Sequence, residues 1–140
     1  MSNGRVVWLS PDDAPDAFPP VNDALREPDG LLAAGGDLGS ARLLAAYRSG
    51  IFPWYDEGQP LLWWSPDPRY VFRRGDLHIS RRLRKEIRKS ELRIRINTAF
   101  ADVIAACAGP RRHQPGTWIT PDMRAAYQRL HGEGWAHSVE

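Results

Sequence analysis

The chain has 140 residues and a mass of 15.8 kDa, with 42% apolar residues, enough for one ordinary domain or for one small domain and part of another. Its one cysteine, Cys107, excludes an intrachain disulfide framework and a multi-cysteine zinc site, and the N-terminus has no long apolar run, which predicts a reduced, cytoplasmic location without a membrane span. The net charge of +2 hides a basic segment, residues 69–95, with eleven basic and three acidic residues, whereas residues 1–68 have four basic and ten acidic ones.

The first element expected in chain order is a helix within "LGSARLLAAYRSG". Ser40 is a suitable N-cap, and Gly50 is placed to end the helix. Leu43, Leu44 and Tyr47 fall on one face at helical spacing. The sequence therefore predicts a short amphipathic helix here.

Two adjacent tryptophans follow in "LLWWSPDPR", just before a turn with two prolines. Pro66 and Pro68 restrict the backbone, so the turn is expected to be rigid. The large rings of Trp63 and Trp64 bury much surface, and we interpret them as packing residues rather than as substrate contacts.

The next element is a basic helix within "HISRRLRKEIRKS", with Ser80 as its N-cap. Leu83 and Ile87 share one side, which we expect to face the core. The rest of the helix has Glu86 as its one acid and six cations: Arg81, Arg82, Arg84, Lys85, Arg88 and Lys89. Because like charges at this spacing repel, the helix predicts an external polyanion, a phosphate backbone first and an acidic protein or membrane surface as the alternative.

A strand and a helix are expected after the basic helix. "ELRIRIN" alternates with period two through Leu92, Ile94 and Ile96, a pattern typical of a strand with one buried face. "NTAFADVIAACAGP" has helical spacing, with four apolar residues on one face: Phe100, Val103, Ile104 and Cys107. Cys107 is therefore interpreted as a core residue rather than as a catalytic thiol.

The last helix is expected in "TWITPDMRAAYQRLHGEG", with Thr120 as N-cap, Pro121 at the first helical position and Gly132 at its end. Its inner face consists of Met123, Ala126, Tyr127 and Leu130. "WAHSVE" then has the pattern of a second strand. Since two strands alone make a marginal sheet, we expect either another chain to complete the sheet or the sequence to be a fragment.

Common catalytic motifs are absent from the sequence. It has no GxxxxGK phosphate loop, no HExxH and no GxSxG, and the "GGDLG" stretch lacks the spacing of a dinucleotide site. The four histidines share no metal-ligand spacing. We therefore expect neither a metal site nor a complete catalytic constellation within these residues.

Five separate segments resemble one protein family. In order they are "GIFPW", "WWSPDPR", "HISR", "GTWI" and "AHSVE", and with the residues around them they resemble the leucyl/phenylalanyl-tRNA-protein transferase family from about Leu25 to Glu140. The resemblance implies an α+β fold class. It implies a small N-terminal α+β domain, residues 1–64, followed by the beginning of an acetyltransferase-like (GNAT-like) α/β domain, residues 65–140, which is truncated.

The resemblance also implies an activity. Members of this family are bacterial cytoplasmic enzymes that transfer leucine or phenylalanine from leucyl-tRNA or phenylalanyl-tRNA to the N-terminal Arg or Lys of acceptor proteins, which marks them for degradation. No metal or redox cofactor is implied, because an aminoacyl ester is already activated, and the full-length enzyme is expected to be a monomer. The family's amine-orienting acid and amide lie beyond "HSVE", so no catalytic residue is assigned here. This leaves two hypotheses: the N-terminal part of an aminoacyltransferase, or a non-catalytic tRNA-binding module.

By the same resemblance, four aromatic residues are expected to bind the terminal adenosine of tRNA. Trp54 and Trp118 match the pair that sandwiches the adenine, and each follows a residue that favours presentation of the ring, Pro53 or Gly116. Tyr47 and Tyr127 are second candidates for the same site, although both also fit a helix core. If the two tryptophans were core residues instead, their removal would cost stability rather than binding.

Overall fold

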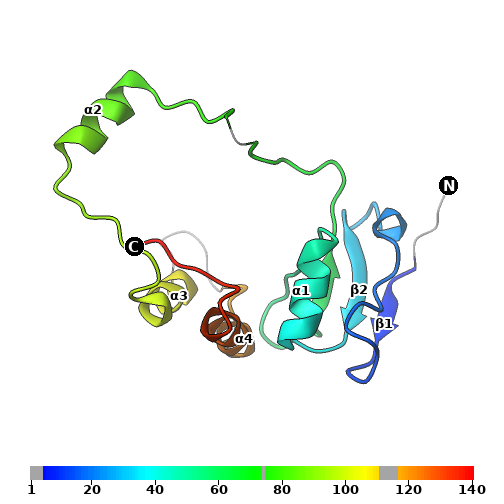
Figure 1. Cartoon of the computed structure of the whole chain (residues 1–140). Helices are drawn as coiled ribbons and strands as arrows, with labels where there is room; N and C mark the ends of the chain where they lie inside the picture. Colours follow the sequence, from blue (N-terminus) through cyan, green and yellow to red (C-terminus); the bar gives the residue numbers. More distant parts are fainter. Residues whose placement is uncertain (1–4, 74, 111–116) are drawn as a thin grey trace.

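A four-stranded mixed sheet forms the N-terminal half of the protein in the computed structural model, which describes residues 5–73, 75–110 and 117–140 (Figure 1). The strands are β1 (Val7–Leu9), β2 (Leu31–Gly35), β3 (Phe52–Pro53) and β4 (Leu62–Trp64). Their order is β1-β2-β4-β3, with β1 parallel to β2 and the other pairs antiparallel. A short 3-10 helix, Val21–Asp23, lies between β1 and β2.

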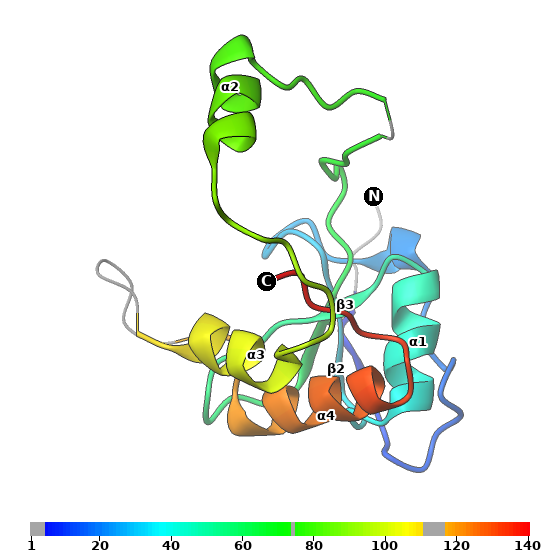
Figure 2. The ribbon, with the colours of Figure 1, turned by 60° about the vertical axis from the view of Figure 1, so that its left-hand side comes forward.

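Helices from both halves of the sequence cover this sheet. Helix α1 (Ser40–Arg48) packs against the sheet, α4 (Pro121–Gly132) packs against α1, and α3 (Phe100–Ala108) packs against α4 (Figure 2). One core cluster joins the sheet, α1 and α4 through Leu9, Leu32, Ala33, Leu43, Ala46, Ile51, Trp63, Ala126 and Leu130. The predicted α+β class is confirmed, and the core is shared between the N-terminal and C-terminal parts of the chain.

Trp63 is the largest side chain in this core, and its packing role is confirmed. The ring is fully buried, its Nε1 donates a hydrogen bond of 2.9 Å to the carbonyl of Gly35, and the edge of Phe18 lies 4.9 Å from it, measured between ring centroids. Trp64 is the next residue of β4, so its side chain points to the opposite face of the strand. The two tryptophans therefore have different surroundings.

The ends of α1 and α4 differ in detail from the sequence-based prediction. Thr120 is the N-cap of α4, since its Oγ1 accepts a hydrogen bond of 3.2 Å from the Met123 amide. Gly39 rather than Ser40 is the N-cap of α1, because the Ser40 hydroxyl donates to Glu133 instead, at 2.9 Å. Glu133 is the C-cap of α4, and the left-handed backbone conformation that follows it falls on Gly134 rather than on Gly132.

The basic helix α2 (Arg81–Lys89) forms where it is predicted, but its apolar side is not buried. Ser80 is its N-cap and accepts a hydrogen bond of 3.2 Å from the Leu83 amide. The predicted core face is wrong: Leu83 is 50% exposed and Ile87 is 58% exposed, and no residue of α2 is buried. Figures 1 and 2 show the reason, since the helix stands on extended connections away from the sheet and the other helices.

Two further predictions for the C-terminal half are wrong. The expected strand over residues 92–96 is reduced to one isolated bridge, in which Ile96 pairs with Val139, and Ile94 remains 79% exposed. Pairing stops there because the rest of this stretch has no neighbouring strand among the described residues. Cys107, expected in the core, is exposed on α3. No helix in the described part of the chain has the length and apolarity needed to cross a membrane.

Candidate functional site

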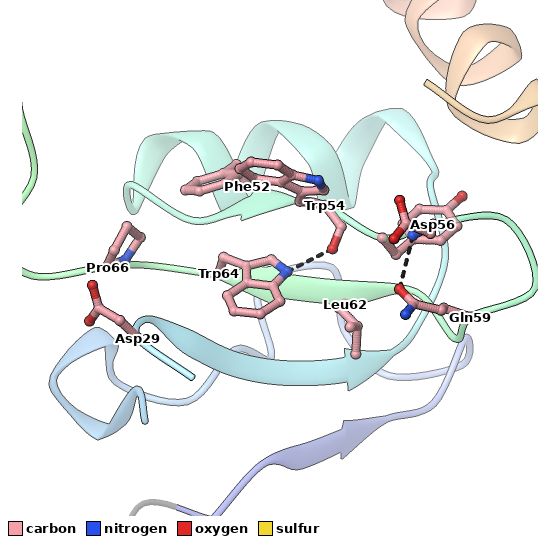
Figure 3. A pocket seen from close by; sticks show the side chains of 9 residues that line it. Asp29, Phe52, Trp54, Asp56, Gln59, Leu62, Trp64 and Pro66 are labelled. Atoms are coloured by element: carbon pink, nitrogen blue, oxygen red, sulfur yellow. Dashed lines mark hydrogen bonds between the residues drawn. The ribbon is translucent and has the colours of Figure 1, made fainter. Parts of the chain in front are cut away.

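The β3–β4 hairpin carries an aromatic cavity of about 350 Å³, here called the hairpin pocket. Antiparallel pairing places Phe52 opposite Trp64 on one face of the hairpin, while Trp63 is in the core. The lining residues are Asp29, Phe52, Trp54, Tyr55, Asp56, Gln59, Leu62, Trp64 and Pro66. Figure 3 shows the rings of Phe52 and Trp54 on one side and the ring of Trp64 on the other.

Trp54 is held at the edge of the hairpin pocket by the backbone. Its carbonyl accepts a hydrogen bond of 2.7 Å from Nε1 of Trp64, and its amide donates to the carbonyl of Leu62 at 3.0 Å. The side chain itself is 52% exposed. The backbone at Trp54 is thus fixed while much of the ring faces solvent, an arrangement suited to stacking against a planar ligand.

Trp118 lines a different cavity, of about 190 Å³ between α3 and α4, here called the helix pocket. Its lining is mostly apolar and consists of Phe100, Val103, Ile104, Cys107, Trp118, Ile119, Met123, Tyr127, His137 and Ser138. The segments that carry Trp54 and Trp118 are nevertheless connected, because the Tyr55 hydroxyl hydrogen-bonds to Thr120 Oγ1 at 3.0 Å. The two tryptophans expected to share one adenine therefore lie in separate pockets on linked segments.

Tyr47 and Tyr127, the second candidates for the adenosine site, lie in contact with each other. Their hydroxyl groups hydrogen-bond to each other, which joins α1 to α4, and Tyr127 lines the helix pocket beside Trp118. Partial burial of the phenol raises the pKa of Tyr47 to about 12, although the positive charge of Arg69 acts in the opposite direction. Tyr47 therefore keeps its hydroxyl proton at neutral pH.

The six cations of α2 are all exposed, and within residues 5–73, 75–110 and 117–140 none of them forms an ion pair. The one ion pair found there joins Arg42 to Asp37 at 2.8 Å, far from α2 in the sequence. No group of three potential metal ligands occurs among the described residues either. The basic helix thus presents uncompensated positive charge to solvent.

The structure adds residues that the sequence analysis did not assign to a site, among them Trp64, which was interpreted there as a packing residue. Phe52 and Trp64 form walls of the hairpin pocket. The guanidinium carbon of Arg69 lies 4.9 Å from the centre of the Phe52 ring. Nη1 of Arg69 also donates to the carbonyl of Gly50 at 2.7 Å. Only the hairpin register and the turn after β4 bring these residues together, so periodicity alone could not identify them.

Comparison with known proteins assigns the family. The sequence profile described as leucyl/phenylalanyl-tRNA protein transferase matches residues 71–140, and the profile of the N-terminal domain of that transferase matches residues 36–67. The chain belongs to the leucyl/phenylalanyl-tRNA protein transferase family. This confirms the resemblance found from the short motifs, and the two matched ranges include all ten residues expected to bind tRNA.

Curated relatives in this transferase family align with nearly the whole chain. Those from Stutzerimonas stutzeri and Aromatoleum aromaticum are each 62% identical over 135 residues, which is 96% of this chain and 59% and 56% of the relatives. One from Xylella fastidiosa strain M12 is 63% identical over 139 residues, 99% of this chain and 57% of the relative. All three are named leucyl/phenylalanyl-tRNA–protein transferase. The chain therefore spans somewhat more than half the length of these relatives.

Proposed function

We propose that this chain binds the 3′ end of leucyl-tRNA or phenylalanyl-tRNA as part of an aminoacyltransferase that moves the amino acid to the N-terminal Arg or Lys of acceptor proteins, tagging them for degradation. The observation that carries the proposal is the half-exposed ring of Trp54, held by its backbone at an aromatic pocket, in a chain that belongs to this family. Charged tRNA occurs in the cytoplasm, so we place the protein there, as a monomer when full length.

The terminal adenine is proposed to stack on Trp54 and Trp118. The Tyr55–Thr120 hydrogen bond supports this, because it ties together the two segments that carry the tryptophans. Stacking on an indole accepts any base and contributes about 1 to 3 kcal/mol per ring. Tyr47 is proposed to donate a hydrogen bond at the same site.

Helix α2 is proposed to bind the phosphates of the tRNA. Four of its exposed cations, Arg81, Arg84, Lys85 and Arg88, are to be replaced singly by alanine, and the affinity for tRNA measured at several salt concentrations. Each replacement is expected to weaken binding and to lower the salt slope by about 0.9. The preference among aminoacyl-tRNAs should not change, because phosphate contacts are the same in every tRNA. An unchanged slope in the combined variant would contradict this role.

The chemistry requires little beyond position. An aminoacyl ester is already activated, so transfer needs a neutral acceptor amine held against the carbonyl and donors for the oxyanion, without a metal or redox cofactor. The family resemblance puts the amine-orienting groups beyond Glu140, in keeping with a small domain of residues 1–64 and the start of an acetyltransferase-like domain in residues 65–140. We therefore assign to the residues of this chain the binding of the tRNA end.

The test of the stacking site is a titration of puromycin, an aminoacyl-adenosine analogue, with thermal melts on the same samples. Trp54→Ala and Trp118→Ala are each expected to weaken binding by about 1 to 3 kcal/mol with little change in Tm, and replacement by Phe should restore part of the affinity. Trp135→Ala is the matched control, because Trp135 is 57% exposed and lies outside both pockets. If affinity falls only in proportion to lost stability, the rings are core residues and the site is refuted.

A transfer assay separates binding from catalysis. With labelled leucyl-tRNA and a peptide that begins with Arg, this chain alone is expected to bind the tRNA without transferring leucine. A binding module without any role in transfer would give the same result, but a longer chain that includes the rest of the family's length would then remain inactive as well. Strong transfer by these 140 residues would place the amine-orienting groups among them and refute our assignment.

A further inference from the structure

Arg69 lies next to the hairpin pocket, against one of the aromatic side chains that line it. Its guanidinium lies over the ring of Phe52, which lines the hairpin pocket. Its charge also acts on Tyr47, whose hydroxyl contacts that of Tyr127, a residue that lines the helix pocket. A cation therefore lies beside one wall of the hairpin pocket.

The hairpin pocket has the shape and chemistry of a slot for one nucleobase. Aromatic rings form two of its sides, and its volume of about 350 Å³ exceeds that of a single planar base (Figure 3). The carboxylates of Asp29 and Asp56 lie at opposite ends of the slot, with the amide of Gln59 beside Asp56. A carboxylate at this position suits the exocyclic amino group of cytosine, which is a hydrogen-bond donor.

Arg69 has donors left for a phosphate. One terminal nitrogen is used by the Gly50 carbonyl, at 2.7 Å, which together with the Phe52 ring holds the guanidinium in place. The remaining N–H groups of an arginine side chain point in fixed directions and match phosphate oxygens. Because the residue is exposed, a phosphate that links a base in the hairpin pocket to its neighbour has access to these donors.

We propose that the hairpin pocket binds the base of the cytidine that precedes the terminal adenosine of tRNA, and that Arg69 binds the phosphate between these two nucleotides. The inference rests on the proposed function, in which the terminal adenine stacks on Trp54. Because the Trp54 ring is half exposed, it offers one face to the hairpin pocket and leaves area for a second base. The indole then lies between two consecutive bases.

The experiment compares adenosine with the dinucleotide CpA, using calorimetry for affinity and the indole N–H resonances of the labelled protein for location. CpA is expected to bind about fiftyfold more tightly than adenosine, since the stacked base adds at least about fivefold and the phosphate about tenfold. The Trp64 indole resonance should shift with CpA and not with adenosine. Arg69→Ala is expected to lower the CpA affinity about tenfold and the adenosine affinity by clearly less.

Two variants keep the result interpretable. Arg69→Gln removes the charge but retains an amide that donates to the Gly50 carbonyl, so it guards against a local change of the turn in Arg69→Ala. Arg5→Ala is the matched control, because this exposed arginine precedes β1, at the opposite edge of the sheet from β3. It is expected to change neither affinity.

The outcomes separate this inference from the proposed function. If adenosine does not bind at all, the proposed function fails and the inference fails with it. If adenosine binds but CpA binds no more tightly, or Arg69→Gln has no effect on CpA, the inference is overturned and the proposed function stands. The inference is also overturned if adenosine alone shifts the Trp64 resonance. A third contrary result would be that arginine amide binds in the hairpin pocket and that Asp29→Asn and Asp56→Asn abolish this binding. The pocket would then be a site for a basic side chain.

Discussion

The sheet with α1 and α4 and the segment of residues 75–96 differ in burial. In the first region most of the apolar residues predicted to face the core are buried, and in the second they are exposed. Leu43 of α1 and Leu83 of α2 both lie on the apolar side of a nine-residue helix. Leu43 is fully buried against the sheet, whereas Leu83 is half exposed. Periodicity therefore shows which face of a helix is suited to burial, but burial itself requires an opposing surface.

The arginines of the two regions differ in the same way. Arg42 of α1 is buried and donates to Asp37 at 2.8 Å and to the carbonyls of Ser10, Asp13 and Ala14. The α2 cations, in contrast, are exposed, and none of them forms an ion pair within the described part of the chain. The same side chain therefore stabilises a loop in one region and is available to a polyanion in the other.

The largest expected effect is on the packed region, from Trp63→Ala. The ring is fully buried and its Nε1 is hydrogen-bonded to Gly35, so its loss should lower the free energy of unfolding by about 3 to 5 kcal/mol. Urea denaturation followed by circular dichroism measures this value. Trp135→Ala, at an exposed site, should change it by less than about 0.5 kcal/mol. Equal effects of the two changes would show that the core is placed wrongly.

The next effect in size is expected from Arg42→Met. Removal of the guanidinium leaves the carbonyls of Ser10, Asp13 and Ala14 without their donor, and the free energy of unfolding should fall by about 3 kcal/mol. The control is Arg48→Met, an exposed arginine of the same helix, for which urea denaturation should give a change below about 0.5 kcal/mol. A loss of less than 1 kcal/mol, roughly the value of one ordinary hydrogen bond, would show that the buried arginine is not needed to hold the loop.

Local signals in the sequence predict where α1 to α4 lie, although not every cap, but they do not predict the sheet. Ser80, Thr120 and Pro121 mark helix starts through hydrogen bonds or dihedral angles that involve only neighbouring residues, so they could be read directly. Strands β1, β3 and β4 have two or three residues each, too few to show a period of two, and β2 is a short run without polar residues to alternate. Residues 92–96 do alternate, yet only their end is paired, because strand formation depends on a partner.

The candidate site was likewise predictable only where local motifs mark it. The motif resemblance named Trp54 and Trp118, because each is part of a short characteristic segment. It did not predict that the two rings line separate pockets, since that depends on how α4 packs against the sheet and α1. Arg69 belongs to the site only through the turn after β4, which directs its guanidinium back onto Phe52.

A smaller, pH-dependent effect is expected at the junction between the two regions. Oε1 of Glu140 accepts hydrogen bonds from the hydroxyl of Thr98, at 2.6 Å, and from the amides of Thr98 and Ala99, next to the start of α3. The hydrogen bond from Thr98 is the main reason why the pKa of Glu140 lies below its ordinary value.

The consequence for stability has a definite sign. Because the folded-state pKa is lowered, the ionised carboxylate stabilises the fold fully above the ordinary pKa of glutamate, and this contribution is lost as the pH falls through the folded-state value. In thermal melts, the Tm of the wild type should therefore be higher than that of Glu140→Gln at neutral pH, and the two Tm values should converge as the pH becomes acidic. If the difference in Tm were the same at every pH, the charge of the Glu140 carboxylate would be excluded as its source.

The smallest expected effect is the one that tests the comparison most directly. Leu83→Ala should change the free energy of unfolding by less than about 0.5 kcal/mol, because half of the side chain is exposed and alanine favours a helix at least as well. Leu43→Ala, the matched change in the packed helix, should cost about 2 to 5 kcal/mol. Both are measured by urea denaturation, with helix content checked by circular dichroism. If Leu83→Ala cost more than 1 kcal/mol, α2 would be packed in solution, and the contrast between the two regions would not hold.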